Sequence, residues 1–202
     1  SYLLTGSGLQ IGFGIFATLA VGTAFGLMNG LIVVYGRLQP IIATLATGAI
    51  AIGLALLLRP QPGGDVDGDL GWALTNTVWD FADTYGWADS GEAWWLAPFG
   101  EIPVPLILLI GVAVVVWLPF KRTVTGRTIY AIGSAESAAY VSGLPINRAK
   151  LAAFTLAGFF SACAGLYLAL QTSSGNADTV QAGAYTLNSI AAVVLGGTAL
   201  AG

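Results

Sequence analysis

Long apolar runs separated by shorter polar stretches set the pattern of this chain. Four runs are long enough to cross the hydrocarbon core of a bilayer, which takes about 20 residues in a helix. They are 9–34, 40–58, 102–120 and 151–170. A fifth run, 182–202, is rich in Ala and Gly, and its Gly196-Gly197 pair would loosen a helix. The pattern predicts an all-α polytopic transmembrane helix bundle with about four full spans and the start of a fifth. We expect residues 1–202 to be a single transmembrane domain, truncated at both ends.

Two long polar segments, 60–101 and 121–150, differ in the sign of their charge. The first carries eight acidic residues and no basic one, whereas the second carries five basic residues and one acidic residue. Basic residues favour the cytoplasmic side of a membrane, and alternating spans would place six of them on one side and Arg59 alone on the other. The six are Arg37, Lys121, Arg122, Arg127, Arg148 and Lys150. We therefore predict that 60–101 is an extracytoplasmic loop and 121–150 a cytoplasmic loop.

A short helix is predicted within the 121–150 segment. Ser134 is a suitable N-cap, Glu136 would lie in the first turn where the helix dipole favours an anion, and Gly143 before Leu-Pro supplies a left-handed stop. These signals give a helix of about two turns, 135–142. Helical spacing creates one face of small side chains that fits closely against another surface, beside a face with Glu136 and Tyr140. The small face consists of Ala135, Ala138, Ala139 and Ser142.

The acidic 60–101 segment also holds five of the six tryptophans. Apolar residues at helical spacing predict a short amphipathic helix at the bilayer surface. They are Leu74, Val78, Phe81, Ala82 and Tyr85. Three aspartates at 65, 67 and 69 resemble the start of a calcium-binding loop, but Leu70 and Asn76 stand where that loop needs Gly and Glu. We therefore favour a solvated acidic loop over a metal site.

Within the spans, small and polar residues are the candidates for specific contacts. Small residues four positions apart predict close helix packing in lipid. The glycines at these sites are Gly22, Gly26, Gly30, Gly158 and Gly165. Four polar residues are candidates for a translocation pathway, namely Asn29, Thr44, Thr47 and Asn188. Alternatively, the Asn29 amide bonds a neighbouring helix and the threonines bond their own helix.

Composition excludes several functional classes. Of the 202 residues, 56% are hydrophobic and 8% charged, whereas a soluble domain has about 25% charged residues. The chain has no histidine and one cysteine, Cys163, and it lacks a Walker A pattern, so we expect no catalytic, metal or cofactor site and no nucleic-acid partner. No charged residue lies in the middle of a span. A transporter of this kind would need energy from elsewhere, because intramembrane charges normally carry ion coupling.

Five stretches together resemble one known family, the membrane permease subunits of ribose- and xylose-type sugar importers of the ATP-binding-cassette (ABC) class. The stretches are NGLIVVYGRLQPIIATLATGAIAIGL from Asn29, IPVP from Ile102, TGRTIYAIGSAESAAYVSGLPINRAK from Thr125, LAGFFSACAGL from Leu156 and LNSIAAVVLGGTALAG from Leu187. The third and fifth are the most specific, in wording and in spacing. Asn188 departs from the family pattern, since many members have Asp there.

The resemblance implies a role and a set of partners. Residues 134–144 would form the coupling element that docks on a separate cytoplasmic ATPase, so the chain itself would not be an enzyme. Further partners would be a periplasmic or lipid-anchored sugar-binding protein and a second permease copy in a homodimer. The protein would be a multi-pass protein of the cytoplasmic (inner) membrane. Two alternatives remain open, a permease of branched-chain amino acid type and a non-transporting membrane scaffold.

Overall fold

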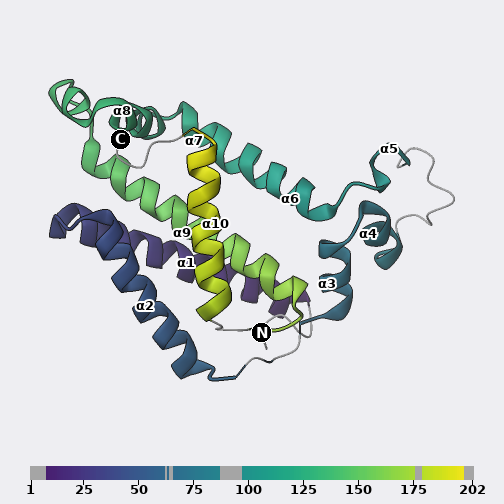
Figure 1. Ribbon diagram of the computed structural model, residues 1–202. Helices are drawn as coiled ribbons and strands as arrows, with labels where there is room; N and C mark the ends of the chain where they lie inside the picture. Colours follow the sequence, from purple (N-terminus) through teal and green to yellow (C-terminus); the bar gives the residue numbers. More distant parts are fainter. Residues whose placement is uncertain (1–7, 62, 64–65, 87–96, 176–178, 198–202) are drawn as a thin grey trace. The chain divides into compact units, whose positions relative to one another are not determined.

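The computed structural model describes residues 8–61, 63, 66–86, 97–175 and 179–197, and these are helical with two isolated bridges and no strand (Figure 1). The elements are α1 (Gly8–Gly36), α2 (Pro40–Leu58), α3 (Gly68–Thr75), α4 (Val78–Thr84), α5 (Ala97–Gly100), α6 (Val104–Val112), a π-helical turn (Ala113–Trp117), α7 (Leu118–Arg122), α8 (Val124–Val141), α9 (Ile146–Gln171) and α10 (Thr179–Leu195). The predicted all-α fold is therefore confirmed.

Four helices are long and apolar enough to cross a membrane. They are Gly8–Gly36, Pro40–Leu58, Val104–Arg122 and Ile146–Gln171. Each coincides with a predicted span, because apolar length is the strongest signal in such a sequence. The fifth run gives a shorter apolar helix that ends at Leu195, where Gly197 takes a φ of 89°. The helix ends just before the Gly196-Gly197 pair, so the prediction that this pair disrupts the helix is confirmed.

By its contacts the chain divides into two compact units, each made of segments far apart in the sequence. One contains Ser1–Thr23, Gly63–Arg122 and Phe159–Gly175, and the other contains Ala24–Pro62, Thr123–Gly158 and Asn176–Gly202. Both draw on α1 and α9.

In the first unit, the polar segment after α2 folds into two short helices instead of the single helix predicted. The α3 helix begins at Asp67, whose side chain accepts a hydrogen bond from the Leu70 amide at 2.9 Å. The helix then ends before 76–77, because the backbone of these residues pairs with the residues that lead into α6. Val78 donates to the Ile102 carbonyl at 3.1 Å, and Val104 donates to that of Asn76 at 2.8 Å.

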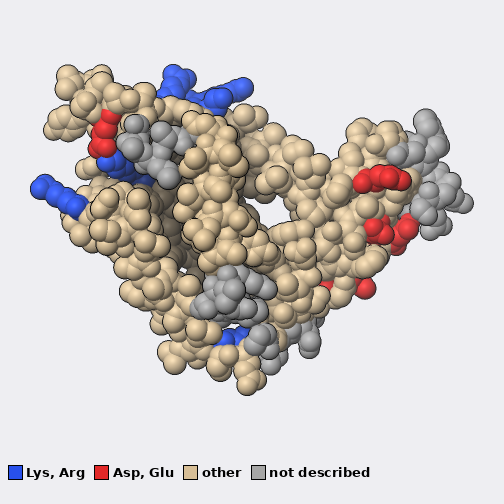
Figure 2. All heavy atoms as spheres, in the orientation of Figure 1, with Lys and Arg blue, Asp and Glu red and all other residues tan. Residues whose placement is uncertain are grey.

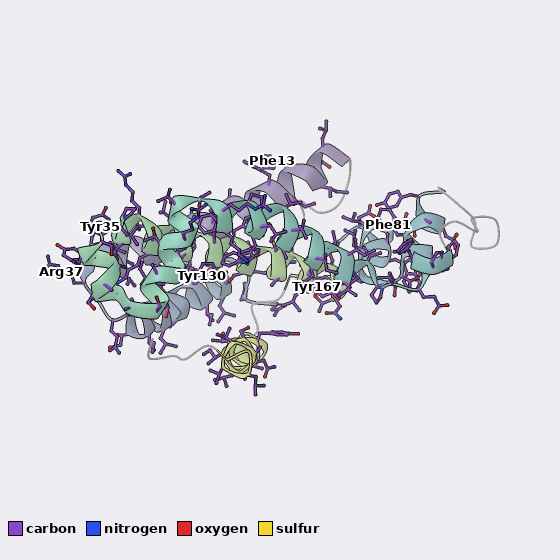
Figure 3. The ribbon with its side chains drawn as sticks, turned by 90° about the horizontal axis from the view of Figure 1, so that it is seen from above. Phe13, Tyr35, Arg37, Phe81, Tyr130 and Tyr167 are labelled. Carbon is purple, nitrogen blue, oxygen red and sulfur yellow. The ribbon has the colours of Figure 1, made fainter. Side chains whose placement is uncertain are left out.

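The α4 helix starts again directly after this break. Phe81 lies on it beside Tyr85, with ring centroids 5.0 Å apart (Figure 3). The prediction of a short helix with Phe81 and Tyr85 on one face is therefore confirmed for α4. It was wrong in extending that helix back to Leu74, which belongs to α3.

A second bridge joins the residues that follow α2 to those that follow α9. Gly63 and Gly175 exchange two backbone hydrogen bonds, of 3.2 and 3.0 Å. In the other unit, at the end of α1 and just after it, Tyr35 and Arg37 are exposed and project from the chain (Figure 3).

The third span is interrupted by one π-helical turn, Ala113–Trp117. The Leu118 amide donates to the carbonyl of Ala113, five residues back instead of four. Val112 and Leu118 on either side keep α-helical dihedral angles. A π-helical turn of this kind adds one residue to the helix without ending it.

Candidate functional site

The α8 helix consists of two helical parts. Thr123 caps the first part by accepting from the Gly126 amide at 3.0 Å, and Ala135 interrupts the helix with φ −163° and ψ 103°. The predicted helix 135–142 corresponds to the second part. Ser134 does not act as the expected N-cap, because its hydroxyl donates back to the Ala131 carbonyl at 2.9 Å and so belongs to the end of the first part.

The second part of α8 ends as predicted. Gly143 has a φ of 73°, its amide donates to the Tyr140 carbonyl at 3.0 Å, and the Leu144 amide donates to that of Ala139 at 3.2 Å. This is the Schellman pattern, which needs a left-handed residue that glycine adopts without strain. The chain then turns directly into α9.

Most of the residues predicted to couple to a partner are exposed on this part of α8. They are Ser134, Ala135, Glu136, Ala138, Tyr140, Ser142 and Gly143. Ala139 differs, because only 4% of it is accessible, and it is buried like Ile146 and Ala149 at the start of α9. A helix of two turns is stable only when one of its faces packs against the rest of the protein. The small face therefore divides into an inward residue, Ala139, and outward ones.

An ion pair joins the two sides of the α8–α9 turn. The Lys150 ammonium lies 2.6 Å from the Glu136 carboxylate, and both side chains are partly exposed. Such exposed pairs contribute about 0.2–1 kcal/mol, so this one fixes orientation more than stability. Beside it runs an open groove of about 810 Å³. Its lining includes Ser137, Tyr140, Val141, Pro145 and Arg148.

The segment from α3 to α5 carries acidic side chains and no basic one, and Figure 2 shows acidic side chains on the surface of its described part. One of them is tied into the fold. The Thr77 hydroxyl donates to Asp80 Oδ2 at 2.6 Å and the Thr77 amide donates to the same atom at 3.0 Å. These two bonds lower the pKa of Asp80 below its ordinary value of 3.8.

Two of the four candidate pathway residues come together. The Thr47 hydroxyl donates to Asn29 Oδ1 at 2.6 Å, which links α2 to α1, and Thr47 is buried. Both threonines also bond their own helix, as the alternative predicted: Thr44 donates to the Pro40 carbonyl at 2.9 Å, and the Thr47 hydroxyl lies 3.0 Å from the Ala43 carbonyl. Asn188 is exposed on α10.

The packing glycines also differ from one another. A Cβ added to Gly26 would collide with the Phe154 carbonyl oxygen and lie 2.9 Å from the Gly158 Cα, so α1 and α9 pack backbone to backbone there. One turn further, a Cβ on Gly30 would lie 3.1 Å from that of Phe154. Gly22 is partly exposed. Gly165 is exposed, and a Cβ there would meet nothing within 4 Å among the described residues.

Sequence reasoning placed the start of the second part of α8 correctly, next to Ser134, but missed the helical first part, 124–134, and the ion pair between Glu136 and Lys150. The ion pair does have a signal. Once Gly143 is accepted as a stop, the chain must reverse, and the opposite charges on either side of the turn are then expected to meet.

The chain is similar to known permease proteins over most of its length. The chain is 37% identical over 174 residues to the ribose import permease protein RbsC of Bacillus subtilis (strain 168), covering 86% of this chain and 48% of that protein. It is 36% identical over 186 residues to RbsC of Escherichia coli (strain K12), covering 92% and 52%. It is 30% identical over 197 residues to the autoinducer 2 import system permease protein LsrD of Escherichia coli O9:H4 (strain HS), covering 97% and 54%. No solved structure matches.

The chain spans about half the length of the curated relatives it matches. These relatives are permeases, and four helices of this chain are long and apolar enough to cross a membrane. It is therefore a multi-pass protein of the cytoplasmic (inner) membrane. A family model described as the permease component of the branched-chain amino acid transport system matches residues 1–202, and the chain belongs to this family.

Proposed function

We propose that this chain forms membrane-spanning helices of an ABC importer that moves a ribose- or xylose-like monosaccharide into the cell, powered by a separate ATPase subunit. The observation that carries the proposal is the identity of 36–37% with proteins named ribose import permeases over most of the chain. The family as a whole is described by amino acid transport, so the assignment to a sugar rests on these relatives.

The charges of the spans support an external source of energy. The α1 and α2 helices contain no Asp, Glu, Lys or Arg, and the basic residues of the other two spans lie at their ends, at 121–122 and at 148–150. Ion-coupled carriers normally hold ionisable groups within the membrane to exchange the driving ion. Spans without such groups fit a protein that receives energy through a surface outside the hydrocarbon core.

The second part of α8 is the surface that we propose for contact with the ATPase. Tyr140 and Val141 are 75% and 86% accessible, which is unusual for an aromatic and a branched apolar side chain outside the membrane. The Schellman turn at Gly143 and the ion pair between Glu136 and Lys150 join this part to α9. A displacement applied to it would therefore reach a spanning helix without being absorbed by a flexible loop.

The other partners follow from the same proposal. The acidic segment from α3 to α5 would meet a soluble sugar-binding protein, because a surface field of one sign favours transient docking. A second copy of the permease would complete the translocation pathway. The loop 60–101 would then face outward and the loop 121–150 the cytoplasm.

Transport by the reconstituted complex tests the proposal. The full-length protein, its ATPase and the sugar-binding protein would be placed in proteoliposomes, and ATP-dependent uptake of labelled ribose, xylose, autoinducer 2 and leucine would be compared. We expect uptake of a pentose and none of leucine. Uptake of leucine alone would replace the sugar proposal by an amino acid permease. Assembly with the ATPase but no uptake of any solute would indicate a scaffold.

A further inference from the structure

Asn29 on α1 and Thr47 on α2 form a polar pair in which the amide nitrogen of Asn29, Nδ2, has no acceptor among the described residues. Asn29 Oδ1 lies 2.6 Å from the Thr47 hydroxyl, which also lies 3.0 Å from the Ala43 carbonyl. In that part of the chain, no buried side-chain nitrogen or oxygen lacks a partner, so this nitrogen lies at the surface of the chain rather than inside it. Asn29 as a whole is partly exposed.

This amide lies at membrane depth. Thr47 is seven residues from the start of α2, which at 1.5 Å per residue is about 10 Å along the helix. The α2 helix has 19 residues, about the thickness of the hydrocarbon core, so its first residue lies near the boundary and Thr47 well inside. Asn29 is seven residues from the end of α1 and bonds Thr47, so it lies at the same depth.

An amide N–H at this depth must face water, a polar group or cargo. Lipid tails offer no acceptor, and an unpaired amide N–H in an apolar medium costs several kcal/mol. On α1 the seam against α9 is formed by Gly26 and Gly30, whereas Leu27 and Leu31 are exposed on the other side. Asn29 lies between these two faces, beside α2.

From this geometry we propose that Asn29 Nδ2 faces the aqueous translocation route and donates a hydrogen bond to a hydroxyl of the cargo. Thr47 acts as a positioning residue, because its hydroxyl holds the other end of the amide. The inference rests on the proposed function for the nature of the cargo. The hydroxyl groups of a monosaccharide accept such a bond readily, and an amide donor adds no charge that would bind the cargo too tightly to release.

Thiol accessibility tests the location without depending on the solute. In a Cys163→Ala background of the complete complex, Asn29→Cys would be treated with a small water-soluble methanethiosulfonate. Leu31→Cys is the matched control, since it lies two residues further along α1, about 200° around the helix, and is 43% accessible. We expect the cysteine at 29 to react roughly tenfold faster, because a thiol in lipid is neither wetted nor ionised. Equal rates would overturn the proposal.

Cargo discrimination tests the contact itself. Uptake of ribose would be compared with uptake of its 2-, 3- and 5-deoxy analogues in the wild type, Asn29→Leu, Thr47→Val and Thr47→Ser. Loss of one hydrogen bond predicts that Asn29→Leu lowers uptake of ribose by about five- to tenfold while that of one analogue changes little. Thr47→Val should change the ratio of ribose uptake to analogue uptake in the same way, and Thr47→Ser should keep the wild-type ratio. The binding protein is common to all variants, so a changed ratio reports on the permease.

A purely structural role of the pair would lower uptake of ribose and of every analogue alike, and that result would refute the contact. If Asn29→Leu fails to assemble, the cysteine variants still decide where position 29 lies. Absence of sugar uptake by the wild type, with fast labelling at 29, would refute the sugar function but leave the aqueous location standing.

Discussion

Gly26 and Gly165 have the same sequence signature, a small residue four positions from another, but the structure separates them. Gly26 lies against the backbone of α9, whereas Gly165 faces open space within the described chain. The signature marks where close packing is permitted. It does not say which helix uses it, because that depends on the register between two spans that no local pattern encodes.

This difference gives a matched pair of variants. Gly26→Leu should prevent normal assembly, because even a Cβ at that position meets the Phe154 carbonyl and the Gly158 Cα, which are backbone atoms that cannot rotate away. Overpacking of this kind costs about 1–3 kcal/mol or more. Gly165→Leu should leave the monodisperse peak of the detergent-solubilised protein and its Tm nearly unchanged. Equal loss in both variants would show that Gly165 packs on a surface beyond this chain.

The polar pair shows the same limit of sequence reasoning. Each of Asn29 and Thr47 was a candidate, and each is seven residues from the turn that joins α1 to α2. Their equal distance from the turn predicts a meeting only if the two helices pack against each other at that height. The sequence shows that they are consecutive, but not that they touch.

The elements could be predicted to different degrees. Spans were predicted to within a few residues, because 20 apolar residues have one stable conformation in a bilayer. The segment after α2 was not, because its helices are set by backbone pairing with 102–104 and by caps rather than by periodicity. The second part of α8 was predicted in position, but Ala139 was assigned to the wrong side.

Ala138 and Ala139 test the docking role of this second part. Ala138→Trp should leave the complex folded but reduce ATPase binding or uncouple hydrolysis from uptake, because Ala138 is exposed and a large ring there holds a partner away. Ala139→Trp should instead destabilise the protein itself, since only 4% of Ala139 is accessible. Pull-down of the ATPase and the Tm would be measured together. Normal uptake by Ala138→Trp would exclude this face as the contact.

The α4 helix provides a pH-dependent test. Because the two bonds from Thr77 lower the pKa of Asp80, the stabilisation is complete above the ordinary value of 3.8 and is lost as the pH falls below it. Asp80→Asn or Thr77→Ala should speed amide exchange in 78–84 by about fivefold at pH 7, the equivalent of a cap worth about 1 kcal/mol.

Protection factors measured by mass spectrometry at pH 7 and pH 3 would show the effect. The difference between the wild type and Asp80→Asn should shrink only as the pH falls below 3.8, because the lowered pKa of Asp80 keeps its charge down to that range. Asp83→Asn, at an exposed position on the same helix, is the control and should exchange like the wild type. A difference that does not change with pH would assign the effect to the amide substitution and not to the charge.

For the whole molecule, the orientation in the membrane is the main prediction. Cysteines would be placed at Asp69 and Ser134, both exposed, in a Cys163→Ala background. Asp69 is preferred to Asp67 because Asp67 caps α3. An impermeant thiol reagent should label position 69 in intact cells and position 134 only after permeabilisation, since four alternating spans would place six of the seven basic residues on the side of Ser134. The reverse result would invert the topology.

The π-helical turn Ala113–Trp117 has a consequence for how this span tolerates change in length. An α-helix turns about 100° per residue, so the extra residue sets the numbering of Leu118–Arg122 out of phase with that of Val104–Val112 by about that angle. Deleting one residue of the turn would therefore close the span as a regular helix and leave the orientation of both flanking helices unchanged, because the turn absorbs the extra residue. The span can thus lose one residue at this turn without moving its ends, whereas the same deletion within Val104–Val112 would turn the residues on one side of it by about 100° relative to those on the other.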